Sequence, residues 1–226
     1  MTPDEFIAKW QHNTRPERAA FVEHFNDLCR LLGEPTPNEA DRDGTSYAFE
    51  KGATKTAGGK GWADVWKHRH FAIEYKGRGK DLAAAFTQLQ RYALALDSPP
   101  LLAVCDFETW IIRTAWTNSV SETYTITLEE LRDPKRRAIL KAMLSDPERL
   151  RPDRTREALT EEAAAEFAEL AARLRARGHD PQAVAHFIQR IVFCLFADDV
   201  GLLPGGLFDR LLATGRRYPD RFADFA

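Results

Sequence analysis

Apolar and polar residues alternate over residues 62–76, and this pattern predicts two β-strands joined by a short turn. In the second run, every second residue from Phe71 to Tyr75 is apolar, which is the period of two expected of a half-buried strand. Glu74 and Lys76 fall on the opposite side of this run. We therefore expect a strand with one apolar face and one face that carries a carboxylate and an ammonium group.

The register of this hairpin decides whether its two acids meet. Pairing Val65 with Ile73 also places Asp64 opposite Glu74, and it requires a turn with an odd number of residues, which His68–His70 supplies. A two-residue turn would send the two acids to opposite faces. The residues of the first run that suit the core face are Ala63 and Val65.

Other segments show helix or strand patterns of their own. Helices are predicted at residues 15–32, 81–96, 128–144, 160–177 and 207–213, with a further helix that Asp180 and Pro181 open and that should be buried on several sides. Strands are predicted at residues 45–50, 101–105 and 109–116, the second of these buried on both faces. Residues 51–61 are rich in Gly and Lys and predict a flexible basic loop.

The character of the chain changes beyond Pro152, where every predicted element is helical. We expect an α/β domain with a mixed sheet at residues 1–152 and an all-α helical domain at residues 153–226. The sequence ends in RFADFA without a polar tail, and we expect it to be a fragment of a longer chain.

Composition and charge narrow the class of protein. No apolar run reaches membrane-spanning length and the N-terminus lacks a signal sequence, so we expect a cytoplasmic protein without a membrane partner. The three cysteines lie far apart in apolar surroundings and predict buried free thiols. The net charge is −2, but residues 51–80 hold eight Lys or Arg and two acids, which is 8 − 2 = +6. This window would attract a polyanion.

Two carboxylates on neighbouring strands repel each other, and a divalent cation is their usual partner. Asp64 and Glu74 therefore predict a metal site for Mg2+, with Mn2+ as an alternative, since oxygen ligands with open water positions suit this ion. Lys76 could orient a water molecule or neutralise charge on a phosphate. The arrangement suits hydrolysis of a phosphodiester.

The hairpin, the helix after it and the buried strand resemble the αβββαβ core of the PD-(D/E)XK nuclease superfamily. The Gln88 and Tyr92 spacing is similar to that of its RecB-like members, although both residues could simply form the polar edge of an amphipathic helix. Ala63 stands where the proline of the superfamily's name would be. Glu50 is a candidate for the metal shell, with a solvated strand end as the alternative.

The order of this motif, a helical region and the stretch FCLFADDVGLLP at 193–204 resembles the N-terminal part of MmeI-like type IIL restriction-modification enzymes. The resemblance implies a Mg2+-dependent endonuclease with Asp64, Glu74 and Lys76 as its catalytic residues and double-stranded DNA as its substrate, with a transient dimer for double-strand cleavage. It also implies an adenine-specific methyltransferase and a target-recognition domain later in the same polypeptide. No methyltransferase motif occurs here, so S-adenosylmethionine belongs to the full-length protein only.

Two other functions stay open at this stage. The region could be a non-catalytic DNA-binding or docking module of a phage-defence methyltransferase, or a RecB-like repair nuclease that acts on DNA ends. Glu17 and Glu23 are expected to be solvated acids on an outer helix face. The basic residues expected to contact DNA are Lys51, Lys55, Lys60, Lys67, Arg69, Arg78 and Lys80.

Overall fold

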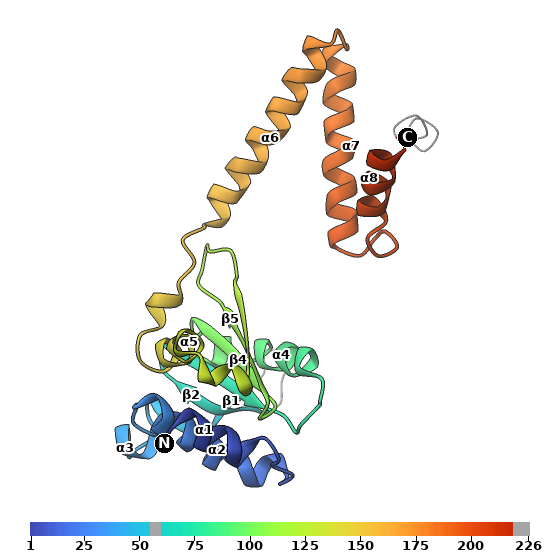
Figure 1. Cartoon of the computed structure of the whole chain (residues 1–226). Helices are drawn as coiled ribbons and strands as arrows, with labels where there is room; N and C mark the ends of the chain where they lie inside the picture. The colour runs from blue at the N-terminus through green and yellow to red at the C-terminus, as the bar shows by residue number, and fades with distance from the viewer. Residues whose placement is uncertain (55–59, 219–226) are drawn as a thin grey trace. The chain divides into compact units, whose positions relative to one another are not determined.

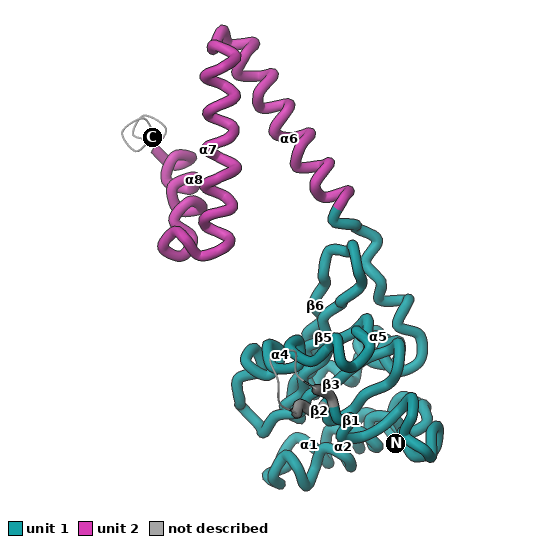
Figure 2. The backbone as a smooth tube through the Cα atoms, turned by 180° about the vertical axis from the view of Figure 1, so that it is seen from behind, with its two compact units in different colours: residues 1–156 teal, residues 157–226 magenta. Residues whose placement is uncertain are grey.

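The structure is a computed structural model that describes residues 1–54 and 60–218, with the backbone alone at 53–54 and 60–62. The chain divides into two compact units, Met1–Arg156 and Glu157–Ala226 (Figure 2). The first unit ends close to the domain boundary expected at residue 152.

One mixed sheet forms the centre of the first unit (Figure 1). Over the described residues its strands, in spatial order, are β1 (Tyr47–Thr54), β2 (Lys60–Lys67), β3 (Phe71–Tyr75), β4 (Leu101–Cys105), β5 (Thr109–Thr114) and β6 (Thr123–Thr127). Neighbouring strands pair antiparallel, except that β3 and β4 run parallel. A parallel pair needs a crossover connection, and α4 (Leu82–Gln90) lies in that connection.

Helices pack on both faces of this sheet. One hydrophobic cluster joins α1 (Pro3–Trp10), α2 (Glu17–Leu32) and α5 (Pro134–Ser145) to Phe71 and Ile73 of β3, and a second joins α4 to Ala72. Neighbouring residues of a strand point to opposite faces, so the two clusters lie on the two sides of the sheet. The other helical elements of this unit are α3 (Pro37–Ala40) and the short 3-10 turns Leu94–Leu96, Glu129–Arg132 and Pro147–Leu150.

Strand β3 corrects one expectation from the sequence. Its residues are buried along the whole strand, so the prediction of a half-buried strand is wrong, because α4 covers the face that carries Ala72 and Glu74. β4 was expected to be buried on both faces, and this is confirmed. The α/β class with a mixed sheet is confirmed as well.

The basic segment 51–61 is also more regular than predicted. β1 continues to Thr54 and β2 begins at Lys60, with backbone pairing from Lys51 opposite Ala63 to Thr54 opposite Lys60. The predicted loop is therefore wrong for these residues, since ladder pairing outweighs the low strand propensity of Gly and Lys. Residues 55–59 lie outside the described residues.

Several helix limits differ from those that periodicity predicted. The helix expected at 81–96 ends at Gln90, and the 3-10 turn Leu94–Leu96 follows it. The helix expected to start at Thr160 is α6 (Arg156–Ala176), so Thr160 does not cap it. The helix expected at 15–32 is confirmed as α2, which ends at Gly33 with φ of 69°. Helix α1 and strand β6 were not predicted.

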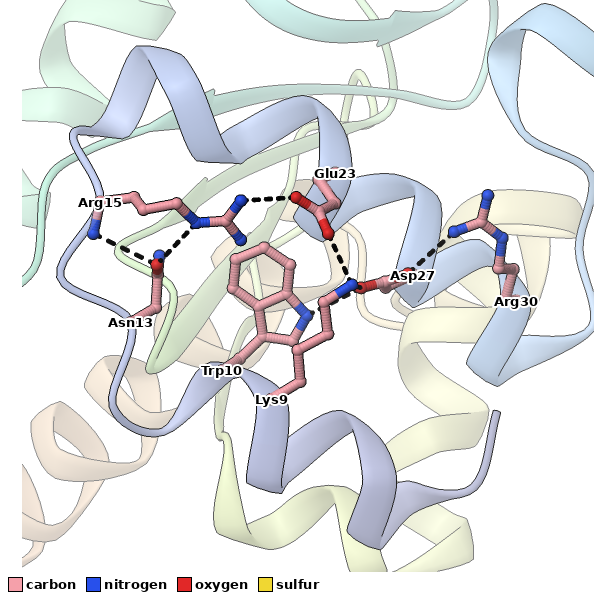
Figure 3. A network of polar contacts seen from close by, with 7 residues as sticks. All are labelled: Lys9, Trp10, Asn13, Arg15, Glu23, Asp27 and Arg30. Carbon is pink, nitrogen blue, oxygen red and sulfur yellow. Dashed lines mark hydrogen bonds and ion pairs between the residues drawn. The ribbon is translucent and has the colours of Figure 1, made fainter.

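A charged network holds α1 against α2 (Figure 3). The buried carboxylate of Asp27 accepts hydrogen bonds from Trp10 Nε1 at 3.1 Å and from Lys9 Nζ at 2.6 Å, and Arg30 lies 2.9 Å away. Glu23 pairs with Lys9 and Arg15. Glu23 was expected to be a solvated acid; its side chain is 43% exposed, and it also belongs to this network.

The second unit consists of α6, α7 (Pro181–Asp199) and α8 (Leu207–Arg217). Among its described residues only Val184 and Ala197 are buried. The prediction that α7 is buried on several sides is wrong within this chain, since Phe193 is 62% and Phe196 is 58% exposed. All three cysteines are free thiols, as predicted; Cys29 and Cys105 are buried, and Cys194 is only partly buried. Within the described ranges, no helix combines the length and the apolar character that crossing a membrane requires.

Candidate active site

The hairpin has the register that brings its two acids to the same place. Val65 pairs with Ile73 and Lys67 with Phe71, so the turn holds three residues, as expected. The backbone pairing between β2 and β3 ends at Val65. At the next residue of β2, the side-chain carboxylate of Asp64 takes the place of a backbone carbonyl as the acceptor for β3. Asp64 Oδ2 accepts from the backbone N–H of Tyr75 at 2.5 Å.

Strand β2 changes faces at this point. Val65 packs in the cluster that contains Ile73, whereas Ala63 packs in the cluster that contains Ala72. The prediction that Ala63 and Val65 share one face is therefore wrong, since regular alternation is interrupted at Asp64. The interruption turns the Asp64 side chain toward the end of β3.

Glu74 lies on the face of the sheet that α4 covers, and its side chain is 6% exposed. Three donors surround its carboxylate: Lys76 Nζ at 2.6 Å, Gln88 Nε2 at 3.2 Å and Tyr92 Oη at 2.7 Å. Gln88 lies in the last turn of α4 and Tyr92 in the turn that follows its end at Gln90, and both side chains reach the same carboxylate. Of the six predicted site residues, the structure thus joins Glu74 to Lys76, Gln88 and Tyr92 by hydrogen bonds. Gln88 and Tyr92 therefore do more than form the polar edge of a helix.

The acids of the site repel each other at short range. Burial and the nearby Glu74 carboxylate raise the pKa of Asp64 from its ordinary value of 3.8 to about 7, and Glu17 adds to the effect. Burial alone would lower the pKa of Lys76, but its hydrogen bond to Glu74 and the charges of Glu17 and Asp64 raise it instead. Lys76 therefore stays an ammonium at neutral pH, while Asp64 is held close to its titration point.

A cavity of about 530 Å³ opens beside Asp64. It is lined by Glu17, Arg18, Phe21, Glu50 and Asp64. Glu50 has a φ of 49°, in the left-handed region that non-glycine residues seldom adopt. Asp64 itself is only partly buried. Because it lines the cavity, its side chain is accessible from there.

Sequence reasoning missed two of these lining residues. Glu17 was expected to be a solvated acid and Arg18 was not considered, yet both lie at the start of α2 and line the cavity with Asp64. Nothing in the local pattern distinguishes them, because helical spacing marks only the buried stripe of α2. Glu17 also lies 47 residues before Asp64 in the sequence, so no local spacing connects the two.

The predicted DNA-contacting residues are dispersed, and several of them hold the fold. Lys67 Nζ donates to the Leu144 carbonyl oxygen at 2.6 Å, and Arg78 bonds to the carbonyl oxygen of Gln11 and pairs with Glu108. Lys51 Nζ lies 4.5 Å from the Trp66 ring centroid. Two others are exposed: Arg69 lies in the hairpin turn and Lys80 precedes α4. Lys55 and the Lys60 side chain lie outside the described residues.

The donor set fits a hard divalent cation with a small number of protein ligands. Asp64 and Glu74 supply carboxylate oxygens, and Asp64 is held at a pKa that an adjacent cation would lower. Among the described residues no group of three or more His, Cys, Asp or Glu side chains is arranged to hold a metal. Two carboxylates with the remaining positions open to water and phosphate oxygens is the pattern that Mg2+ accepts.

Comparison with protein families identifies the chain. The family model described as the MmeI N-terminal domain matches residues 1–177, and the model described as the MmeI helicase spacer domain matches residues 182–225. No curated protein and no solved structure matches the chain. The two models cover nearly the whole sequence in the order found in the structure, an α/β unit followed by helices. The chain belongs to the MmeI family of restriction-modification enzymes and corresponds to its N-terminal region.

Proposed function

We propose that residues 1–152 form a Mg2+-dependent endonuclease that hydrolyses phosphodiester bonds of double-stranded DNA. The observation that carries the proposal is the convergence of Asp64, Glu74 and Lys76 at one end of the hairpin, next to an open cavity. Apart from the one-turn helix α3 and the 3-10 turn Leu94–Leu96, the chain order is α2-β1-β2-β3-α4-β4, which is the αβββαβ order of the PD-(D/E)XK nucleases and supports this assignment. Membership in a restriction-modification family supports it independently.

Each residue has a role that follows from its contacts. Asp64 and Glu74 would hold the ion, which when bound supplies Lewis-acid polarisation of the phosphate and a water molecule of lowered pKa. Lys76 keeps its positive charge beside Glu74, where it can donate a hydrogen bond to a phosphate oxygen or orient a water molecule. Gln88 and Tyr92 fix the orientation of the Glu74 carboxylate. Such fixed orientation matters because metal affinity depends on the partners of each ligand.

The helices beyond residue 152 take a different role in this proposal. They would act as the spacer between the nuclease and an adenine-specific methyltransferase with its target-recognition domain in the full-length polypeptide, where S-adenosylmethionine would bind. A transient dimer would supply the second active site for double-strand cleavage, since one site cuts one strand. Sequence selectivity would then reside outside this region.

The test combines metal binding with DNA cleavage. Wild type, Asp64→Ala and Lys76→Met are titrated with Mg2+ and Mn2+ by calorimetry, and the same proteins are incubated with supercoiled plasmid. Asp64→Ala should lose both metal binding and nicking, while Lys76→Met should lose nicking and keep metal binding. Asp153→Asn, which alters an exposed acid of the same unit, is the matched control and should behave as wild type.

One observation favours a second function, a docking module without catalysis. Both oxygens of Glu74 already accept hydrogen bonds from protein donors, as a purely structural carboxylate would. A docking module would bind no metal, leave the plasmid intact and tolerate loss of Asp64. A repair nuclease acting on ends would spare the closed circle and degrade the same plasmid after linearisation, whereas a docking module would leave both forms intact, so comparing the two forms separates all three functions.

A further inference from the structure

The cavity beside Asp64 is lined mainly by acids, yet the proposed substrate is a polyanion. Glu17, Glu50 and Asp64 contribute three carboxyl groups to its wall. The carboxylates would repel a phosphate that enters such a cavity unless a positively charged side chain also lines it. Among the described residues that line it, Arg18 is the cation.

The side chain of Arg18 is exposed, and it makes no hydrogen bond or ion pair within the part of the chain that the structure describes. Nearby basic residues differ from it in this respect. Arg15 is bound to Asn13 and Glu23, Arg78 to Gln11 and Glu108, and Lys76 to Glu74. Arg18 therefore keeps its full set of donors for a ligand.

The stability of α2 does not explain this position. Arg18 is the second residue of α2, and a cation near a helix N-terminus opposes the helix dipole. The preceding Pro16 offers no side-chain hydrogen bond to the helix end, and the first turn also carries the acid Glu17, so the positive charge there comes from Arg18. A guanidinium group also presents a planar fork of donors that matches two oxygens of one phosphate.

We propose that Arg18 is a substrate-positioning residue that binds a backbone phosphate of the DNA strand at the cavity, so that the neighbouring phosphodiester is presented to Asp64. This inference rests on the nuclease function proposed above. It assigns to α2 a part in DNA binding that the basic residues 51–80 were expected to play alone. The contact is to the backbone and gives no sequence selectivity.

The test measures DNA binding separately from cleavage. A short fluorescent duplex is titrated in EDTA at several salt concentrations with wild type, Arg18→Ala, Arg18→Lys and the control Arg149→Ala, an exposed arginine of the same unit. Arg18→Ala should weaken binding about five- to tenfold and lower the slope of log affinity against log salt by about 1. Arg18→Lys should keep the slope and lose part of the affinity, because a point charge replaces the fork.

Cleavage kinetics add a second reading. Arg18→Ala should raise KM for nicking while kcat stays within about threefold, because the residue binds substrate and does not touch the reacting atoms. Thermal melts of all variants check that the fold is intact. Binding by Arg18→Ala with the affinity and salt slope of wild type overturns the inference, and it does so whether or not the protein cuts DNA. Loss of nicking in Asp64→Ala with normal binding in Arg18→Ala would overturn the role of Arg18 and leave the nuclease function standing.

Discussion

Replacing Asp64 by Asn should stabilise the protein at neutral and alkaline pH while it abolishes nuclease activity. The amide is close in shape to the carboxyl group, and its oxygen can still accept the hydrogen bond from the Tyr75 N–H. What the variant loses is the negative charge, which burial and the Glu74 carboxylate make unfavourable in the folded protein. Active-site residues commonly impose such a stability cost.

The size of the effect follows from the pKa of Asp64, which rises from 3.8 to about 7. Each unit corresponds to about 1.4 kcal/mol, so a shift of about three units sets an upper limit of about 4 kcal/mol. Asp64 is partly exposed to the cavity, and solvent screening reduces the value, so we expect a gain of about 1–3 kcal/mol.

The pH dependence gives the prediction its sign. A carboxyl group whose pKa is higher in the folded state binds its proton more tightly there, so its ionisation destabilises the fold. The contribution of Asp64 to the free energy of unfolding should therefore fall as pH rises from 3.8 to about 7. The difference between Asp64→Asn and wild type should be absent at the acid end of this window and complete above it.

Urea unfolding in EDTA across this pH window measures the difference, with Asp153→Asn as the exposed control. Adding Mg2+ should then stabilise wild type and leave Asp64→Asn unaffected, because ligand binding to the folded state raises its stability. The reasoning is refuted if Asp64→Asn is less stable than wild type above this pH window, or if the difference does not change with pH. Either result would show that the Asp64 charge does not destabilise the fold.

Three further predictions concern residues that hold the site and the fold. Tyr92→Phe removes a buried hydrogen bond to Glu74, so it should lower the unfolding free energy by about 1.5–3 kcal/mol and slow nicking. The control Tyr124→Phe removes an exposed hydrogen bond to Glu122 and should change neither quantity. Asp27→Ala leaves the buried Trp10 Nε1 unpaired, and denaturant unfolding should show a loss of about 2–3 kcal/mol, against less than about 1 kcal/mol for Asp4→Ala in an exposed ion pair. Lys67→Met should lower the melting temperature and leave DNA affinity unchanged in a duplex titration, because Lys67 binds the Leu144 carbonyl oxygen.

The hairpin was predictable because its information is local. The three-residue turn fixes the pairing of Val65 with Ile73 and so brings Asp64 to the end of β3 where Glu74 lies. The four-residue spacing of Gln88 and Tyr92 likewise brings both side chains to Glu74, although Tyr92 lies just beyond the end of α4. The extent of burial was not predictable, since it depends on α4 packing against β3, which no local pattern shows. The same limit applies to the cavity: Glu17 and Arg18 reach Asp64 through the packing of α2 on the sheet.

Some elements were missed because their patterns are weak. Helix α1 has eight residues, and its buried side chains Phe6, Ile7 and Trp10 make less than three turns of stripe. Strand β6 is a sheet edge with one fully buried residue, Ile126. In both cases packing against neighbouring elements stabilises the segment, so its own sequence predicts neither the helix nor the strand. Charge was misleading for a related reason: Lys67 and Arg78 look like DNA contacts in the sequence but serve as donors to backbone carbonyl oxygens.

The uneven distribution of buried apolar residues affects how this protein is made in the cell. Both hydrophobic clusters lie within residues 6–150, so the first unit can fold on the ribosome as soon as it leaves the exit tunnel. Helix α7 emerges later and presents Phe187, Phe193 and Phe196 to solvent. Exposed aromatic side chains in a nascent chain attract chaperones and promote misassembly. The helical region is therefore the part of the described chain whose apolar side chains would be most open to a chaperone during synthesis.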